Sequence, residues 1–524
     1  MKQKLPTRRM REHPDLEQLK RQAKELLAGF RAGETAAAEE VRAHYEGARV
    51  DAFALHDAQL VIARGYGFDS WPKLKAYVDG VNIRRLVEAV REGDIERVDA
   101  MLKSRPELAN MTVSYGDEHR AIHYAVIHRR PEIARLLMRK GANARAGIHP
   151  HRDATSALTL ARERGYDDIV AIIEEEERRQ AKPAAVPAPA SAESEERIAA
   201  ARGDLEWLRS RFAEGRLTNP VRWEDGGLLT VAVRENRIDV LRFLLDCGFD
   251  PDERVSYGEG DWIAWSQGYP LWHAAALGRR EMAELLLHRG ANPNVHVDSS
   301  GSSVYSAYSH GQWEMVELMR SRGGIVTGDI AATYRQTDLA RQLLTGGASS
   351  PEELLRFGAG GGAVEIVRMA LEHIRWPRHD ARWFRMLAEP LYFWHHIPWL
   401  YAGNKDFDRA SYLDCFRLIL HVCDVNIVGS FGRTILHEIA AMRDHISEDE
   451  VTAFGREALA AGARMDHRDE ILNSTPLGWA CRWGRPALVK LLLERGADPD
   501  ENDAEPWARP RSWLEKMGHA EIVF

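Results

Sequence analysis

The sequence predicts an all-α protein: a solenoid of stacked helix pairs with a helical module ahead of it. The first observation is a recurring spacing, in which an apolar residue is followed by glycine seven residues later and by glycine again nineteen residues after the start. The second is apolar residues at helical spacing before the last glycine, such as Leu488, Leu491 and Leu492. The third is an amphipathic helical pattern within residues 15–79. A helix pair cannot bury both of its faces alone, so successive pairs are expected to stack.

The recurring spacing has a clear structural chemistry. The Thr475 hydroxyl can cap a first helix, and Pro476 presets the backbone for its first turn. Gly484 then ends that helix, because glycine readily adopts the left-handed conformation that reverses the chain. Three places carry the whole spacing, namely Leu271/Gly278/Gly290, Val304/Gly311/Gly323 and Leu477/Gly484/Gly496, and four keep one interval, namely Ile122–Gly141, Leu229–Gly248, Leu158–Gly165 and Leu355–Gly362.

The chain is expected to consist of four segments. Residues 1–80 are a helical leader that covers the end of the array, and its first helix carries Leu16, Leu19, Ala23, Leu26, Leu27 and Phe30 on one face after the capping residue Asp15. Residues 83–179 are a first array with a degenerate opening unit and two repeats. Residues 180–194 are rich in proline and alanine, so they form a semi-stiff linker, or a loop between docked halves. Residues 195–524 are a second array of six to eight units.

Two segments of the second array depart from the repeat pattern. Residues 254–270 read as an extended loop ahead of the repeat at Leu271, and residues 375–412 are far more aromatic than the chain average of 8%. Insertions in a repeat array project on one face and often carry the binding role. We therefore expect binding sites in these two segments.

The repeated phrases Thr-Pro-Leu, Ala-Ala-x-x-Gly, Leu-Leu-Leu and Gly-Ala-Asn/Asp-Pro-Asn/Asp resemble ankyrin repeats. The resemblance covers most of residues 83–524 unevenly, because several units exceed the 33 residues between Leu271 and Val304. The stretch LHDAQLVIARGYGFDSWPKLKAYV is similar to a leader that commonly precedes ankyrin arrays in bacterial proteins. The resemblance thus implies an ankyrin solenoid, a capping role for the leader and a bacterial source.

The resemblance also implies where a partner binds. In ankyrin proteins the two positions before the mid-repeat glycine face a concave groove that holds the ligand. Here those positions are mixed in charge, which suits a protein surface better than nucleic acid. Leu277 is one of these positions, and among them we single out Arg234, Glu235, His310, Arg482 and Trp483.

Trp262, Trp265 and Tyr269 lie on the extended loop, flanked by Glu253, Glu259 and Asp261. Exposed, they would form an acidic and aromatic cluster that fits a planar or cationic ligand or a partner surface. Folded inward, the same rings would instead pin a long loop to the repeats. The sequence leaves both readings open.

The second segment holds nine rings that must be shielded from water: Trp376, Trp383, Phe384, Tyr392, Phe393, Trp394, Trp399, Tyr401 and Phe407. One reading packs them in the core of an enlarged helix–loop–helix. The other makes a small-molecule pocket or partner surface, lined by Trp394, His395, His396, Trp399 and Tyr401.

Composition narrows the function further. The chain has 71 Lys and Arg against 79 Asp and Glu, a net charge of -8, which argues against a dedicated nucleic-acid binder. Four scattered cysteines suit a reducing compartment, and the lack of a long apolar run predicts a cytoplasmic protein without a membrane span. No motif of a nucleotide-binding, hydrolase or metalloprotease site is present, so no cofactor or metal is expected.

These observations together predict a non-enzymatic scaffold that binds a protein partner through the groove and the projecting aromatic loops. The alternative is a small-molecule-binding protein or an atypical enzyme, with its pocket near residues 375–412. The identity of the partner is not encoded in the repeat pattern, because one scaffold serves many functions.

Overall fold

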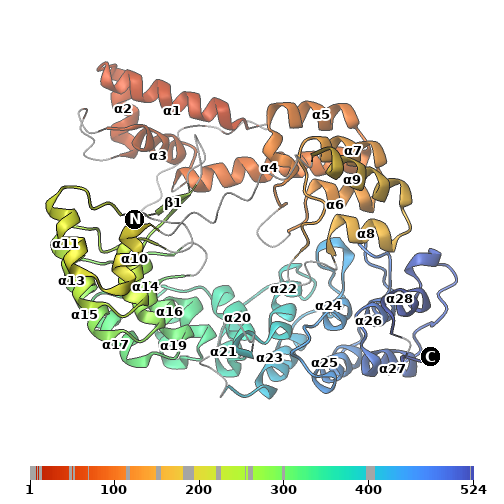
Figure 1. The fold of residues 1–524 in the computed structure, drawn as a ribbon. Coiled ribbons are helices and arrows are strands. Elements are labelled where there is room, and N and C mark those ends of the chain that lie inside the picture. Colours follow the sequence, from red (N-terminus) through yellow and green to blue (C-terminus); the bar gives the residue numbers. More distant parts are fainter. Residues whose placement is uncertain are drawn as a thin grey trace. The chain divides into compact units, whose positions relative to one another are not determined.

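The computed structural model confirms an all-α solenoid of stacked helix pairs (Figure 1). The chain divides into two compact units, Met1–Ala184 and Ala185–Phe524. For residues 255–257 and 264–266 the backbone alone is described. The structure describes residues 8, 10, 14–45, 50, 53–68, 70–113, 118–148, 155–180, 194–219, 226–253, 255–257, 264–297, 301–396, 407–519 and 521–524.

The first unit begins with a helical leader that has an apolar core of its own. Asp15 caps its first helix by accepting a hydrogen bond from the Glu17 backbone N–H at 2.9 Å. The buried face of that helix carries the leucines expected from the sequence, and Phe30 packs on Phe53 with ring centroids 4.7 Å apart. The leader consists of α1 (Leu16–Arg31), α2 (Thr35–His44), α3 (Leu55–Gly65) and the first half of α4 (Trp71–Glu92).

Helix α4 belongs to two parts of this unit. Leu74 and Val78 lie in the leader core, whereas the second half of α4 is the first helix of the array and packs against the two helices that follow it. The helix is continuous through Gly80, a residue that a helix interior tolerates at a modest cost. The array of this unit contains α5 (Ile95–Ser104), the 3₁₀ helix η1 (Pro106–Ala109), α6 (Ala121–Ile127), α7 (Pro131–Arg139), α8 (Ala157–Glu163) and α9 (Asp167–Gln180).

The second unit is a long stack of helix pairs closed by a single helix, α28 (Pro510–Met517). The first helices of the pairs form an inner row and the second helices an outer row (Figure 1). The inner row contains α10 (Glu195–Arg202), α12 (Leu228–Arg234), α14 (Tyr269–Ala276), α16 (Ser303–Ser309), α18 (Gly328–Thr333), α20 (Pro351–Gly360), α22 (Arg382–Ala388), α24 (Ile435–Ala440) and α26 (Pro476–Arg482). The outer row contains α11 (Leu205–Ala213), α13 (Ile238–Asp246), α15 (Arg280–His288), α17 (Trp313–Ser321), α19 (Thr337–Thr345), α21 (Val364–His373), α23 (Ala410–Leu420), α25 (Glu448–Ala460) and α27 (Pro486–Glu494).

In several pairs the short turn between the two helices has a positive φ, whether or not it holds glycine. Gly278 has a φ of 65° there, and Arg129, Asn236 and Arg335 have φ values of 48°, 56° and 57°. A left-handed backbone is costly for residues with a Cβ atom, so the surrounding pair must hold it in place. The two repeats that lack the middle glycine in the sequence therefore keep its geometry.

Arginines at the start of second helices join neighbouring pairs. Arg237, which precedes α13, donates from Nε to the carbonyl of Ala201 at 2.8 Å, and Arg130 donates from Nη2 to the carbonyl of Arg91 at 2.8 Å. Arg485 donates to the carbonyls of Ala440 and Met442. Each bond places a cation on the carbonyl end of a first helix in the preceding pair, where the helix dipole favours positive charge.

The aromatic segment 375–412 contributes a helix pair to the stack. Helix α22 continues into the 3₁₀ helices η3 (Glu389–Tyr392) and η4 (Trp394–His396) and packs between α20 and α24, while α23 packs between α21 and α25. Phe393 and Tyr412 are buried and stack with centroids 4.4 Å apart. Of the nine rings, Trp383 and Phe393 are buried, and Trp399 and Tyr401 lie outside the described residues. The remaining five are half-buried: Trp376, Phe384, Tyr392, Trp394 and Phe407. The core and the pocket interpretations therefore both stay predictions.

Candidate functional site

The candidate surface lies where three inner-row helices end. Arg234 and Glu235 are exposed at the end of α12, and His310 is exposed at the end of α16. Between them Leu277 follows α14 and leaves 46% of its surface exposed. We call Arg234, Glu235, Trp272, His273, Leu277 and His310 the inner-row surface.

Two half-buried rings precede Leu277 on α14. Trp272 and His273 are successive residues of α14 whose ring centroids are 5.1 Å apart, and the Trp272 ring meets the His310 ring edge-on at 6.1 Å. The Ser306 hydroxyl donates to the carbonyl of Trp272 at 3.0 Å, which ties α16 to α14. The inner-row surface therefore presents apolar and aromatic groups at its centre with charged groups beside them, the usual arrangement of a protein-binding patch.

The His310 ring has a defined orientation. Its Nδ1 lies 2.8 Å from the carbonyl oxygen of Ser306. Because a carbonyl oxygen can only accept, Nδ1 carries the proton and donates it. In the neutral ring Nε2 is then the acceptor. His310 can therefore accept a hydrogen bond from a bound partner at this atom.

The extended loop is a β-hairpin. Strands β1 (Val255–Tyr257) and β2 (Ala264–Ser266) pair antiparallel, with Ser256 opposite Trp265. The backbone of Trp265 is thus placed in β2, whereas its side chain and all of Trp262 lie outside the described residues. The partner-binding role of both tryptophans stays a prediction.

Tyr269 lies at the base of the hairpin. Its side chain is 5% exposed and packs with Val297 and with the partly buried Trp272. Tyr269 therefore points inward, as in the interpretation in which its ring holds the loop to the repeats, and not outward as part of an exposed cluster. Beside it the expected acidic cluster is wrong in one member: Glu253 is 1% exposed because its carboxylate is bound by backbone N–H groups of α12. Sequence reasoning missed this role, although Glu253 ends an Asp-Pro-Asp-Glu phrase that recurs at 498–501.

At the far end of the unit, Arg482 and Trp483 follow α26. The Arg482 guanidinium lies 4.7 Å from the Trp483 ring and 5.7 Å from the Trp513 ring, and the side chain is 4% exposed. Trp483 is half-buried. Arg482 thus contributes mainly by holding two indoles, and Trp483 offers part of its ring at the surface.

The pocket suggested near the aromatic segment has three described residues. Trp394 packs edge-on against Phe357 at 5.7 Å and lies over Gly360. His395 is 1% exposed, and its Nε2 lies 2.6 Å from the carbonyl of Thr333. Burial lowers the pKa of His395 to about 4, so the neutral ring donates to that carbonyl. His396 is half-buried, and burial lowers its pKa as well. His395 and Trp394 therefore link η4 to α18 and α20.

Cys415 and Cys423 are buried thiols. Burial raises the pKa of Cys415 and of Cys423 to about 12, so both stay protonated thiols at neutral pH. Within the described ranges, His, Cys, Asp and Glu side chains form no group of three or more that could hold a metal ion. The helices of the same ranges include none with the length and hydropathy needed to cross a bilayer.

Comparison with known proteins locates the repeats. A family model described as "Ankyrin repeat" matches residues 267–297, which hold α14 and α15. A second, described as "Ankyrin repeats (3 copies)", matches residues 408–503, from α23 to α27. A search of the curated proteins finds no significant match. The chain is therefore an all-α solenoid in which residues 267–297 and 408–503 are ankyrin repeats.

Proposed function

We propose that this protein is a non-enzymatic scaffold that binds another protein through the inner-row surface and the hairpin at 255–266. Ankyrin repeats generally mediate protein–protein interaction, and α14 lies in one of the matched repeats. The observation that carries the proposal is Leu277, which is 46% exposed directly after the helix that carries the half-buried rings of Trp272 and His273. The exposed part of this leucine gains nothing from burial in the free chain and can supply apolar contact to a partner.

The charges around Leu277 support a protein ligand. Arg234 and Glu235 put opposite charges side by side, so the surface has no cationic stripe to follow a phosphate backbone. The aromatic hairpin precedes α14 directly and extends the same surface in our proposal. The reduced, buried thiols of Cys415, Cys423 and Cys481 support a cytoplasmic location, and the leader resemblance supports a bacterial source.

The test is affinity purification of the tagged full-length chain from its own host, with proteomics and native mass spectrometry on the eluate. Trp262→Ala combined with Trp265→Ala, and separately Leu277→Asp, should each lower recovery of a stoichiometric protein at least tenfold. The matched control is Trp313→Ala, because Trp313 is 50% exposed on the outer-row helix α17.

Melting temperatures separate binding from folding. Leu277→Asp and Trp313→Ala should melt within a few degrees of the wild type, because both side chains are exposed. Our proposal expects the same of the double tryptophan variant. A partner that is lost with Trp313→Ala and kept by the other variants would contradict the proposal. A chain that purifies alone with a bound metabolite would instead favour the small-molecule alternative near Trp394.

A further inference from the structure

The phrase Asp-Pro-Asp-Glu occurs twice, at 250–253 and 498–501, each time in the turn after a second helix. The two turns share a side-chain hydrogen bond and a left-handed closing residue. Asp250 accepts from the N–H of Asp252 at 3.0 Å, and Asp498 accepts from the N–H of Asp500 at 3.0 Å. The closing residues, Glu253 and Glu501, have φ values of 43° and 39°. Both are therefore held in the left-handed region that disfavours residues with a Cβ atom.

Glu253 caps α12 from a distance. Its carboxylate accepts the N–H groups of Gly227 at 2.8 Å, Leu229 at 2.8 Å and Thr230 at 3.1 Å, and it also binds the Thr230 hydroxyl. The residue at the N-cap of α12 is Gly227, which has no side chain to do this. A Cβ atom on Gly227 would lie 2.5 Å from Glu253 Oε1, so glycine there leaves room for the carboxylate.

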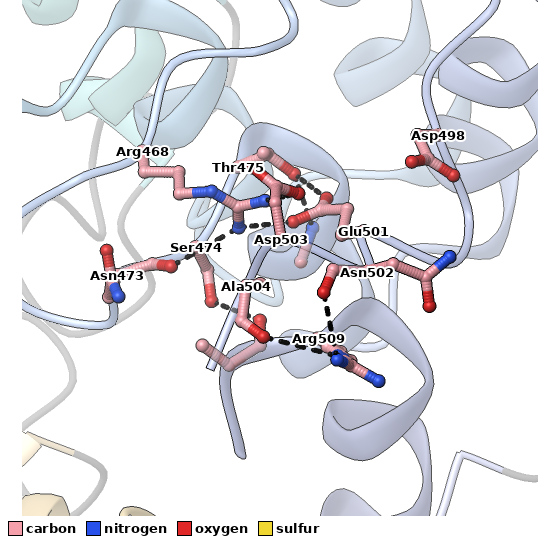
Figure 2. Close-up of polar contacts among 12 residues, drawn as sticks. Arg468, Asn473, Ser474, Thr475, Asp498, Glu501, Asn502, Asp503, Ala504 and Arg509 are labelled. Atoms are coloured by element: carbon pink, nitrogen blue, oxygen red, sulfur yellow. Dashed lines mark hydrogen bonds and ion pairs between the residues drawn. The ribbon is translucent and has the colours of Figure 1, made fainter. Parts of the chain in front are cut away.

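Glu501 does the same for α26 through an intermediate (Figure 2). The Thr475 hydroxyl donates to Glu501 Oε1 and accepts the N–H of Gly478 at 3.4 Å in the first turn of α26. Arg468 donates to Glu501 Oε2 at 2.5 Å. The side chains of Glu253 and Glu501 are 1% and 3% exposed. Burial raises the pKa of both carboxyls, and the donors around each one oppose that rise.

After each of these glutamates the chain forms an additional element before, or instead of, the next helix pair. Beyond Glu253 it forms the hairpin of β1 and β2, whose base is closed by the Gly268 N–H donating to the carbonyl of Asp252 at 2.5 Å. Beyond Glu501 it forms the 3₁₀ helix η6 (Pro506–Ala508) and the closing helix α28. Val295 holds the corresponding place in the next repeat, five residues after Gly290, where the chain continues to α16.

We propose that Glu253 and Glu501 are positioning residues: each buried carboxylate fixes its own left-handed backbone and so sets the direction in which the following segment departs. Glu253 orients the hairpin, and Glu501 orients α28. The backbone angle and the carboxylate contacts depend on each other, because a strained φ persists only where the surroundings hold it. The effect of Glu253 on partner binding rests on the proposed function of the hairpin. Its effect on the backbone of the hairpin does not depend on that function.

The test is hydrogen–deuterium exchange of the full-length chain. In Glu253→Ala, the amides of β1 and β2 should exchange at least tenfold faster, together with those at the start of α12. In Glu501→Ala, the amides of α28 should respond and those of the hairpin should not. Glu281→Gln, at an exposed position in the first turn of α15, is the matched control and should change neither.

Glu253→Gln guards against a fold too damaged to interpret. The amide keeps the length of the side chain and one acceptor oxygen but brings N–H groups against the N–H groups of α12. It should give an intermediate rise in hairpin exchange. If exchange rises in the first turn of α12 alone, Glu253 is a plain helix cap and the positioning proposal is overturned.

Partner recovery distinguishes the two proposals. Glu253→Gln should lower it together with hairpin protection. A hairpin that loses protection while the partner still binds would overturn the role of the hairpin in binding and leave Glu253 as a positioning residue. A hairpin that keeps its protection would overturn the positioning role whatever the partner does.

Discussion

His437 should make the second unit sensitive to acid. Its side chain is fully buried, and Nδ1 accepts the N–H of Thr434 at 3.0 Å. Nε2 lies 3.1 Å from the carbonyl of Ser474 in the next repeat, so it carries the proton and donates. Protonation would place a second N–H directly against that of Thr434. Burial accordingly lowers the pKa of His437 to about 4.

The sign and size of the effect follow from linkage. The folded pKa is lower than the ordinary value of about 6.5 in the unfolded chain, so the unfolded state binds more protons between the two. The stabilising contribution of the neutral His437 ring is therefore fully present above about pH 6.5, and the free energy of unfolding falls as the pH drops below that value. At pH 5 the unfolded ring lies about 1.5 pH units below its pKa, which at 1.36 kcal/mol per unit costs the fold about 2 kcal/mol.

Urea unfolding followed by tryptophan fluorescence between pH 8 and pH 5 measures this loss. His437→Asn keeps an acceptor for the Thr434 N–H but cannot titrate, so its stability should fall about 2 kcal/mol less over that range than that of the wild type. The matched control is His288→Asn, an exposed position at the end of α15, which should follow the wild type. Equal pH dependence in the wild type and His437→Asn would refute the reasoning.

Two further predictions concern the ends and turns of the stack. Trp513 is fully buried in α28, and its Nε1 donates to the Ser474 hydroxyl at 2.8 Å. Trp513→Ala should lower the free energy of unfolding by about 3–5 kcal/mol, and the amides of α26 and α27 should then exchange before those of the rest of the unit. An unchanged urea midpoint would contradict this prediction. Asn236 has a φ of 56° at an exposed turn. Asn236→Gly should therefore raise the free energy of unfolding by at most about 1 kcal/mol, and Asn236→Ala should lower it. The reverse order of urea midpoints would count against backbone strain at this position.

The repeat spacing predicted the fold because backbone turns impose it. The spacing did not predict the pair α18 and α19. In that pair Gly328 occupies the position at which other repeats have the apolar residue that begins the spacing. A Cβ atom on Gly328 would collide with the Ser349 hydroxyl, which itself binds Glu353 at 2.6 Å. A contact with the next repeat thus requires glycine where an apolar residue is expected. Such a contact cannot be inferred from the local spacing of residues.

The site was only partly predictable for a similar reason. Sequence placed Arg234, Glu235 and His310 at helix ends, where they are exposed, because the mid-repeat turn fixes those positions. It could not tell that Tyr269 points inward or that Glu253 is buried, because both depend on a neighbouring helix supplying a surface or donors. The repetition of Asp-Pro-Asp-Glu was the available signal for Glu253.

Helix α4 has a consequence for cooperativity. Its first half completes the leader core and its second half supplies the first helix of the array, without an interruption between them. A helix that is lost from one core is lost from the other, since its hydrogen-bonded turns propagate along a single rod. The leader and the opening repeats are therefore expected to melt as one thermodynamic unit, with no boundary near Gly80 at which the array could be separated intact.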